Sequence, residues 1–396
     1  MIVLGLFIIS HNHLLNNEFN ISAYLIGLTI LLLSLLLYLK YFSLIDFHLT
    51  LYLLVTIFSQ FFYMLRFGII QAGFVEAIII YIIVPCVFYG IYKIMLKTPD
   101  IAVFSLKFIS LMSIISFVGS ILYILSHLNI SDLFPETFKL EITQTGEDIQ
   151  IKNTSFYGNS LTVGGLALVQ AMSSIYLYIK TNKNIFLIFL MLAVLVCLLS
   201  LARRSMVPLC LLLVIFQFYL PYKQRIISSA VLLTIFLCGI IMFHEEFLSI
   251  LTRLVSSFDL TDPTSGNESR IRFMKKGVEI IATEPFGVGL ANLSSLGKGW
   301  KDLVYGAPVG FLTVVESGYL VFIGEIGIIG CFILLPSFVI FLKKLSSYSV
   351  YLVILPIALE TIMGLSIYSL LILSLLLCTL ASIEAIENRN FKLNKS

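Results

Sequence analysis

The sequence is poor in charged residues, and several motifs of common enzyme sites are absent from it. Charged side chains make up 12% of the 396 residues, whereas hydrophobic residues make up 59%. The chain contains no Asp-x-Asp pair, no Walker-type phosphate loop and no Gly-x-Ser-x-Gly nucleophile motif. Its five histidines show no metal-ligand spacing. We therefore exclude a P-loop nucleotide site and a serine nucleophile elbow, and we expect neither a metal nor another cofactor.

The positions of the cysteines exclude two further kinds of site, whereas the scattered charge excludes none. All six cysteines fall inside apolar runs, so we expect no disulfide and no thiolate metal site. The net charge of +3 is small and scattered along the chain, so it argues neither for nor against nucleic acid; the partners that we expect do not include nucleic acid. The first ten residues lack a basic region and a small-residue cleavage site, so we interpret them as a short first span.

Long apolar runs dominate the chain and predict an all-α polytopic membrane protein. Each run approaches the ~20 residues that a helix needs to cross a bilayer, and none alternates with the period of two that is typical of barrel strands. We predict about twelve transmembrane helices in a single membrane domain over residues 1–396. The predicted spans are 1–11, 22–39, 45–65, 75–96, 103–127, 158–179, 185–201, 205–220, 226–244, 312–342, 348–363 and 366–386.

Basic residues at the ends of these runs predict the orientation. They gather on one side, which the positive-inside rule assigns to the cytoplasm together with both termini. The two long loops, 128–157 and 245–311, then lie on the outer side. In the first loop, apolar and polar residues alternate on both sides of Gln144–Asp148, which predicts a β-hairpin. The hairpin either acts as a lid or spacer or contacts the substrate directly.

Two adjacent arginines contradict the charge pattern of the other loops. Arg203 and Arg204 lie between two predicted spans on the outer side. Arginine near a bilayer is costly unless it pairs or reaches lipid headgroups. The two arginines either contact lipid phosphates or form a clamp for an anionic ligand, because a guanidinium binds phosphate oxygens in a bidentate manner.

The second outer loop contains a predicted amphipathic helix over about residues 269–282. Its apolar face comprises Ile271, Met274, Val278 and Ile281, and its charged face comprises Arg272, Lys275, Lys276 and Glu279. At about 100° per residue, Arg270 projects onto the apolar side, whereas Arg272 does not. A helix lying on the membrane surface would therefore bury Arg270, which makes it a candidate functional residue. The alternative is that its position at the start of the helix lets its side chain escape burial.

Carboxylates near the outer ends of the spans complete a candidate polar site. Glu316 begins the tenth span and is the candidate general base, because a partly desolvated carboxylate has a raised pKa. Glu325 lies deeper in the same span among three glycines, and we interpret it as a buried structural partner. Glu360 and Arg66 lie near the outer ends of their own spans.

Several short motifs resemble the O-antigen polymerase and ligase superfamily. They are Ser200-Leu-Ala-Arg-Arg-Ser-Met206, Glu268-Ser-Arg-Ile-Arg272, Glu284-Pro-Phe-Gly-Val-Gly289, Glu316-Ser-Gly-Tyr-Leu320 and Gly324-Glu-Ile-Gly-Ile-Ile-Gly330. The order of these motifs, the number of predicted spans and the long loop before the tenth span also fit. The resemblance implies a GT-C-like fold and an inverting, metal-independent glycosyltransferase.

The resemblance also implies a substrate, a location and partners. Donor and acceptor would be undecaprenyl-diphosphate-linked oligosaccharides, joined at the periplasmic face of a bacterial inner membrane within the lipid bilayer. A chain-length regulator and a flippase would be partners. The family's two arginines correspond to Arg204, with Arg203 beside it, and to Arg270, with Arg272 near it.

One departure from the family pattern bears on the choice between polymerase and ligase. Ligase relatives place a histidine near the start of the span where this chain has Glu316, and this difference favours the polymerase. Trp300 and Tyr305 in the loop would stack on sugar rings or anchor the loop at the interface. The alternatives are an O-antigen ligase and a lipid-linked oligosaccharide flippase or other transporter.

The helix-face argument predicts different effects for neighbouring arginines. We expect Arg270→Ala and Arg204→Ala each to abolish long-chain polymer while the protein remains in the membrane, and Arg272→Ala to be milder. Glu316→Gln should also inactivate. The measurement is the surface glycan profile together with the protein level in membranes. Equal loss from all three arginine variants at normal expression would contradict the argument.

Overall fold

The computed structural model describes most of the chain and is predominantly helical. The described residues are 47–67, 77–127, 141–145, 148–157, 159–200, 202–226, 228–230, 267–290, 293, 317–363 and 369–388, with a few isolated positions before residue 34. The helices are α4 (Phe47–Phe67), α6 (Val84–Lys97), α7 (Pro99–His127), α8 (Ser160–Thr181), α9 (Asn184–Leu199), α10 (Arg203–Tyr219), α13 (Asn267–Thr283), α15 (Gly318–Ile326), α16 (Ile328–Lys344), α17 (Ser347–Ser349), α18 (Leu355–Met363) and α19 (Leu370–Asn388). Short π-helical segments η2 (Ile79–Ile83) and η6 (Val350–Ile354) precede α6 and α18, and a 3-10 turn, η3 (Ser155–Tyr157), precedes α8.

The helix lengths identify a multi-pass membrane protein. Among the described residues, five helices are long and apolar enough to cross a membrane, or six if α15 and α16 form one bent span. Three shorter apolar segments correspond to α9, to α10 and to α17 through α18. The predicted spans 1–11, 22–39 and 226–244 lie largely outside the described residues, so the total of about twelve stays a prediction.

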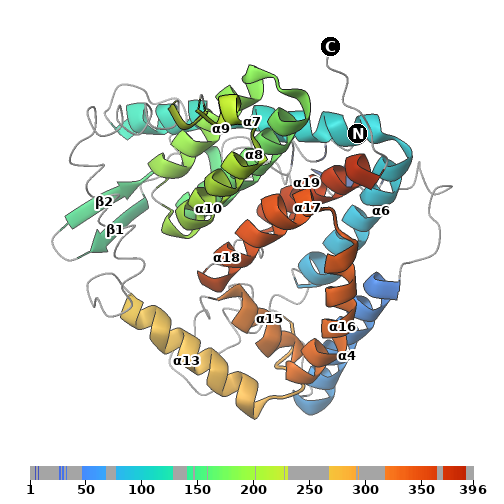
Figure 1. Cartoon of the computed structure of the whole chain (residues 1–396). Helices are drawn as coiled ribbons and strands as arrows, with labels where there is room; N and C mark the ends of the chain where they lie inside the picture. Colours follow the sequence, from blue (N-terminus) through green and yellow to red (C-terminus); the bar gives the residue numbers. More distant parts are fainter. Residues whose placement is uncertain are drawn as a thin grey trace.

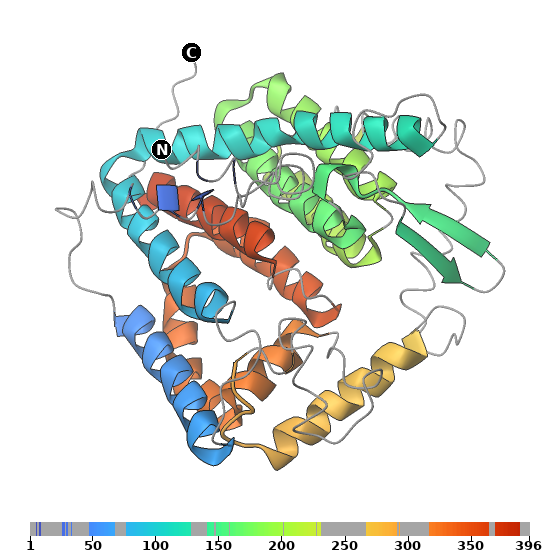
Figure 2. The same ribbon diagram turned by 180° about the vertical axis from the view of Figure 1, so that it is seen from behind.

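Helix α8 lies at the centre of the largest bundle and is almost wholly buried. It packs against α7, α9, α10 and α19 (Figure 1). The long helix α7 runs along one edge of the molecule, as seen from behind in Figure 2. Small residues on α8 allow this close packing, since membrane helices associate through tight van der Waals contact rather than through exclusion of water.

A line of serines joins α7 to α8 inside the bundle. Ser110 Oγ lies 2.6 Å from Ser174 Oγ, and Gln170 donates from Nε2 to Ser116 Oγ at 2.8 Å. Tyr157 of η3 lies with its hydroxyl 3.1 Å from the same Ser116 oxygen. Burial raises the pKa of Tyr157 to about 12, so this hydroxyl stays protonated. These hydrogen bonds fix the rotation of the two helices relative to each other.

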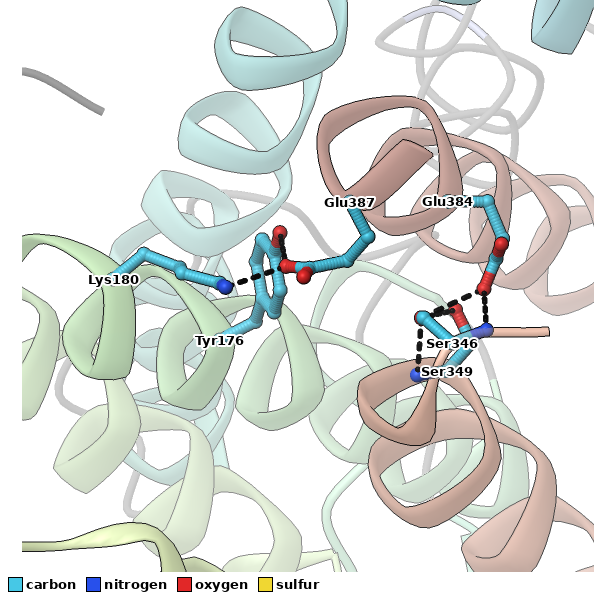
Figure 3. A network of polar contacts seen from close by, with 6 residues as sticks. All are labelled: Tyr176, Lys180, Ser346, Ser349, Glu384 and Glu387. Atoms are coloured by element: carbon cyan, nitrogen blue, oxygen red, sulfur yellow. Dashed lines mark hydrogen bonds and ion pairs between the residues drawn. The ribbon is translucent and has the colours of Figure 1, made fainter. Parts of the chain in front are cut away.

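A second polar network ties three elements together at one end of the bundle (Figure 3). Lys180 of α8 forms an ion pair with Glu387 of α19, with 2.7 Å between Nζ and Oε1. Tyr176 donates to the same carboxylate oxygen at 2.6 Å. Glu384, which like Glu387 belongs to α19, accepts from both the backbone N–H and the Oγ of Ser346, each at 2.7 Å. The network therefore joins α8, α19 and the connection that leads into α17.

Strands β1 (Glu141–Thr145) and β2 (Asp148–Lys152) form an antiparallel hairpin in the first long loop. Ile142 pairs with Ile151, and Gln144 pairs with Ile149. The alternation of apolar and polar residues indicated a hairpin in this segment. The hairpin lies outside the helical bundle in both views (Figures 1 and 2).

The segment predicted as one span, residues 312–342, is not one straight helix, because the chain bends within it. Helices α15 and α16 meet at Gly327 and are inclined by 111°. Gly327 has a φ of 86°, a conformation that residues with a Cβ rarely adopt. We call this bend, residues 324–330, the elbow.

The elbow is held by the turn that follows α13, residues 284–290. The Val288 N–H donates to the Gly324 carbonyl at 2.9 Å, and the Ile329 N–H donates to the Pro285 carbonyl at 3.2 Å. Ser59 of α4 donates to the Glu325 carbonyl at 2.7 Å. These bonds replace those that a continuous helix would have made within itself, as a bilayer requires.

The elbow predicts a strong dependence on one glycine. A Cβ on residue 327 would lie 2.3 Å from the Phe286 carbonyl carbon and 2.5 Å from the Gly287 nitrogen. We expect Gly327→Ala to lower stability by more than ~2 kcal/mol, because backbone atoms cannot yield and the φ is strained. The measurement is the thermal unfolding of the detergent-solubilised protein.

Gly330→Ala is the matched control for this prediction. Its Cβ would meet side-chain atoms only, Ile326 Cγ2 at 2.7 Å and Val55 Cγ1 at 2.9 Å, and its backbone is helical. We expect a clearly smaller shift of the unfolding temperature. The same large shift in both variants would show that general crowding, and not the bent backbone, limits the site.

Candidate functional site

The two arginines that oppose the charge pattern begin a helix. Arg203 and Arg204 are the first two residues of α10, and the N-cap residue Ala202 provides no side-chain cap. Cations at a helix N-terminus face the positive end of the helix dipole, which costs stability. The arrangement concentrates positive potential at one point. Arg204 is half-buried there, whereas the side chain of Arg203 lies outside what the structure describes.

Close packing fixes the start of α10 against α8. A Cβ on Gly164 of α8 would lie 2.5 Å from Ala202 Cβ and 2.9 Å from Ser205 Oγ, so only glycine permits this approach. Helix α8 itself begins nearby, where Asn159 caps it by accepting from the Leu161 N–H at 2.7 Å. Arg204 is therefore held near the first turns of α8.

Glu360 lies at the same end of the neighbouring helix. Helices α10 and α18 pack against each other. Tyr219, the last residue of α10, stacks on Tyr348 of α17, which leads through η6 into α18, with 5.1 Å between ring centroids, so α10 and α18 run antiparallel. From this pair, ~22 Å along each axis leads to Arg204 on one helix and to Met363 on the other. Glu360 lies about one turn from that level and is 1% exposed. The structure thus brings a predicted arginine and a predicted carboxylate to one end of a helix pair.

Glu325 is buried inside the elbow, as the prediction of a structural partner requires. Its Oε2 accepts from the Tyr81 hydroxyl at 2.6 Å, and its Oε1 accepts from the Leu293 N–H at 2.9 Å. The residue is 0% exposed. Its carboxyl group therefore joins η2, the elbow and the segment that follows the 284–290 turn.

Residues of α4 that the sequence analysis did not name hold the 284–290 turn in place. Gln60 accepts from the Leu290 N–H at 3.1 Å, and the ring of Tyr63 lies against Gly289, which has a φ of 80°. Ser59 and Gln60 are polar residues inside an apolar run, and this was the signal available for finding them. The 284–290 turn is thus bonded to both α4 and the elbow.

The rotation of α13 differs from the sequence interpretation. Gly277 and Ile280 are buried on its protein-facing side, with Ile281 close to Gly324 of α15, whereas Val278 is 55% exposed. The side of α13 that faces the protein is therefore rotated about the helix axis relative to the predicted apolar face and shares only Ile281 with it. The reason is that the helix packs on its neighbour through Gly277. Arg270, seven residues before Gly277, has nearly the same angular position on the helix, and Arg272 lies almost opposite.

The remaining predicted residues are placed only in part. Arg66 is the penultimate residue of α4, and Arg270 and Arg272 lie in the first two turns of α13; the side chains of all three lie outside what the structure describes. Glu316, Trp300 and Tyr305 fall outside the described residues.

Helix α13 forms one side of the molecule in both views (Figures 1 and 2). Its C-terminal end meets the elbow, where it packs on α15, and its other end points toward the β1–β2 hairpin. Helix α15 contacts α18, and Tyr319 donates to the Ala358 carbonyl at 3.1 Å. Contacts therefore run from α13 through α15 and α18 to the start of α10.

The comparisons with known proteins identify one family. Residues 186–335 match the family model described as O-Antigen ligase. The matched region begins in α9 and ends in α16, so it contains Arg203, Arg204, α13 and the elbow. No curated protein and no solved structure matches the chain. The family match confirms the resemblance to the O-antigen polymerase and ligase superfamily.

The hydrogen bonds of Glu325 predict a structural role that can be measured. Glu325→Gln would leave one of the two donors, Tyr81 OH or Leu293 N–H, without an acceptor. A buried unsatisfied donor costs about 1–3 kcal/mol. We expect a lower unfolding temperature of the solubilised protein. Glu279→Gln on the exposed side of α13 is the control and should lower the temperature far less, because contacts of an exposed carboxylate contribute little; equal unfolding temperatures of the two variants would refute the role.

Proposed function

We propose that this chain, which carries the O-antigen ligase family region over residues 186–335, is an O-antigen polymerase. Members of this family comprise polymerases and ligases, both of which transfer glycosyl groups. The polymerase would extend a glycan by joining undecaprenyl-diphosphate-linked repeat units. The observation that carries the proposal is the pair of arginines at the N-terminus of α10, inside the family region and packed beside α8 and α18.

The charge arrangement suits a diphosphate leaving group. When the bond between the sugar and the diphosphate breaks, negative charge develops on the diphosphate oxygens. Fixed cations stabilise that charge, and guanidinium groups bind such oxygens in a bidentate manner. Arg203 and Arg204 begin α10, so their charges and the positive end of the α10 dipole would act on the anion at the same place.

Helix α13 would bring the other cations. Arg270 lies on the same side of α13 as Gly277 and Ile281, two and three turns further along the helix, and these two residues face the protein. We therefore assign Arg270 to the diphosphate and give Arg272, on the opposite stripe, a weaker part. The hydrogen bonds between the 284–290 turn and the elbow would hold α13 in that rotation.

Proton transfer completes the proposed reaction. Glu316 would accept the proton of the acceptor hydroxyl as that oxygen attacks the anomeric carbon of the donor sugar, and the diphosphate would leave from the opposite face. Trp300 and Tyr305 would stack on the sugars. Arg66, Glu325 and Glu360 would support the site, and the bonds of Glu325 described above fit that part.

The choice of polymerase over ligase rests on Glu316. A ligase-like chain would carry a histidine near that position, and this chain has Glu316-Ser-Gly-Tyr-Leu320. We place the protein in a bacterial inner membrane, with both termini in the cytoplasm and the hairpin and α13 in the periplasm. A flippase would supply its substrate, and a chain-length regulator would act with it.

Deletion of the gene in its host tests the function. We expect the surface lipid to carry a single repeat unit in place of a long chain, with recovery on complementation by the wild-type chain. The measurement is the electrophoretic ladder of the surface lipopolysaccharide. A total loss of glycan from lipid A core would identify a ligase, and accumulation of lipid-linked repeat units on the cytoplasmic leaflet would identify a flippase.

A further inference from the structure

A cavity lies between α4 and α16 beside the elbow. It has a volume of about 480 Å³ and is lined almost wholly by apolar side chains, among them Leu54, Ile57 and Phe58 of α4, Ile329 and Ile333 of α16, and Phe286 of the turn. Gly330 lies in its wall, where the absence of a side chain lets Val55 and Ile326 approach. We call this cavity the α4–α16 groove.

The groove opens on a surface that faces hydrocarbon. Helix α4 is a candidate membrane span, and α16 is the longer part of the bent span. Phe58, Ile57 and Ile333 are each at least half-exposed although all are strongly apolar. In a bilayer such side chains contact lipid chains rather than water. The occupant that fits the groove is therefore a hydrocarbon chain.

The position of Phe286 connects the groove with the proposed diphosphate site. Phe286 follows α13 by three residues, and its ring lies 4.6 Å from that of Phe62. The same segment therefore carries Arg270 at one end and a wall of the groove at the other. Along α13 these ends are about 20 Å apart.

A lipid with an anionic headgroup and a very long tail matches this spacing. The headgroup would lie at the cations of α13 and α10, and the tail would pass along the protein surface into the groove. The chains of an ordinary phospholipid cover only about half of the ~30 Å hydrocarbon core, so a phospholipid with its chains in the groove would have its headgroup short of Arg270. Charge at one end and an apolar cavity at the other thus favour the lipid-linked substrate.

We propose that the α4–α16 groove binds the isoprenoid chain of the lipid-linked substrate. The inference rests on the proposed function, because that function supplies the polyprenyl diphosphate. The groove would select the carrier by its tail and hold it in the outer half of the membrane. One wall, α4, is tied by the Ser59 hydrogen bond to the Glu325 carbonyl in the elbow, from which the other wall, α16, continues.

Photocrosslinking in membranes of the native host tests the proposal. The photoreactive residue p-benzoylphenylalanine replaces Phe58 in the groove or, as the matched control, Phe332, which is 66% exposed on α16 but does not line the groove. After illumination, mass spectrometry identifies the crosslinked lipid. We expect polyprenyl adducts at Phe58 to exceed those at Phe332 by about tenfold, a ratio that corresponds to ~1.4 kcal/mol of preference.

The other occupants are outcomes that overturn the proposal. Phospholipid adducts in equal yield at both positions would show a groove filled by bulk lipid. A crosslink between Phe58 and another segment of this chain would show that the protein itself covers the groove. The result is independent of the deletion phenotype: a ligase phenotype with polyprenyl adducts at Phe58 would refute the polymerase alone, and a polymerase phenotype with phospholipid adducts would refute the groove alone.

A second pair of variants tests the groove by filling it. Ile333→Trp places a large side chain in the cavity, whereas Leu335→Trp places one on the same helix at nearly equal exposure, 52% against 50%, outside the cavity. We expect Ile333→Trp to lower the Phe58 polyprenyl adduct by about tenfold and Leu335→Trp to leave it unchanged. Equal adduct yields in both, with both proteins present in the membrane, would contradict the proposal.

Discussion

The structure depends on one constraint, which is that a helix broken inside a membrane must have its freed peptide groups paired. At the elbow the chain bends by 111°, and each unpaired N–H or C=O left in hydrocarbon would cost several kcal/mol. The carbonyls of Gly324 and Glu325 accept from Val288 N–H and Ser59 Oγ instead. The turn after α13 is therefore part of the hydrogen bonding of the span. The position of α13 follows from it, since a helix that ends in that turn is bonded to α4 and α15 at once.

The sequence predicted those parts of the fold whose secondary structure follows from one local property, such as the length of an apolar run or the alternation of apolar and polar residues. Helices α7 and α8 each follow from a continuous apolar run near bilayer length, and the hairpin follows from the alternation around Ile142 and Ile151. The elbow was missed because the apolar run does not stop at Gly327. A glycine inside such a run is ordinary, and the partner that stabilises the bend lies about forty residues earlier. Pairing over that distance leaves no local signal.

The candidate site shows the same division. Arg204 was singled out because a charge that opposes the charge pattern of the other loops is rare in an apolar chain, and the buried Glu325 because a carboxylate among glycines needs a partner. Its partner Tyr81 was not found, since a tyrosine in an apolar run has many ordinary uses. The rotation of α13 was misjudged at Val278, because periodicity identifies an apolar stripe but not which edge of it meets protein. Only the neighbouring helix decides that.

The network of Lys180, Glu387 and Glu384 has a mechanical consequence. It joins α8, α19 and the entry to α17 at one end of the bundle, while Arg204 and Glu360 lie toward the other end of the adjoining pair α10 and α18. Helix α10 is held at its other end as well, where Gly164 lets Ala202 and Ser205 pack directly on α8. Packed helices that are held at both ends cannot open by rotation about either end. The charge of Arg204 would therefore keep its place when an anionic headgroup enters, and no free energy would be lost in rearranging it.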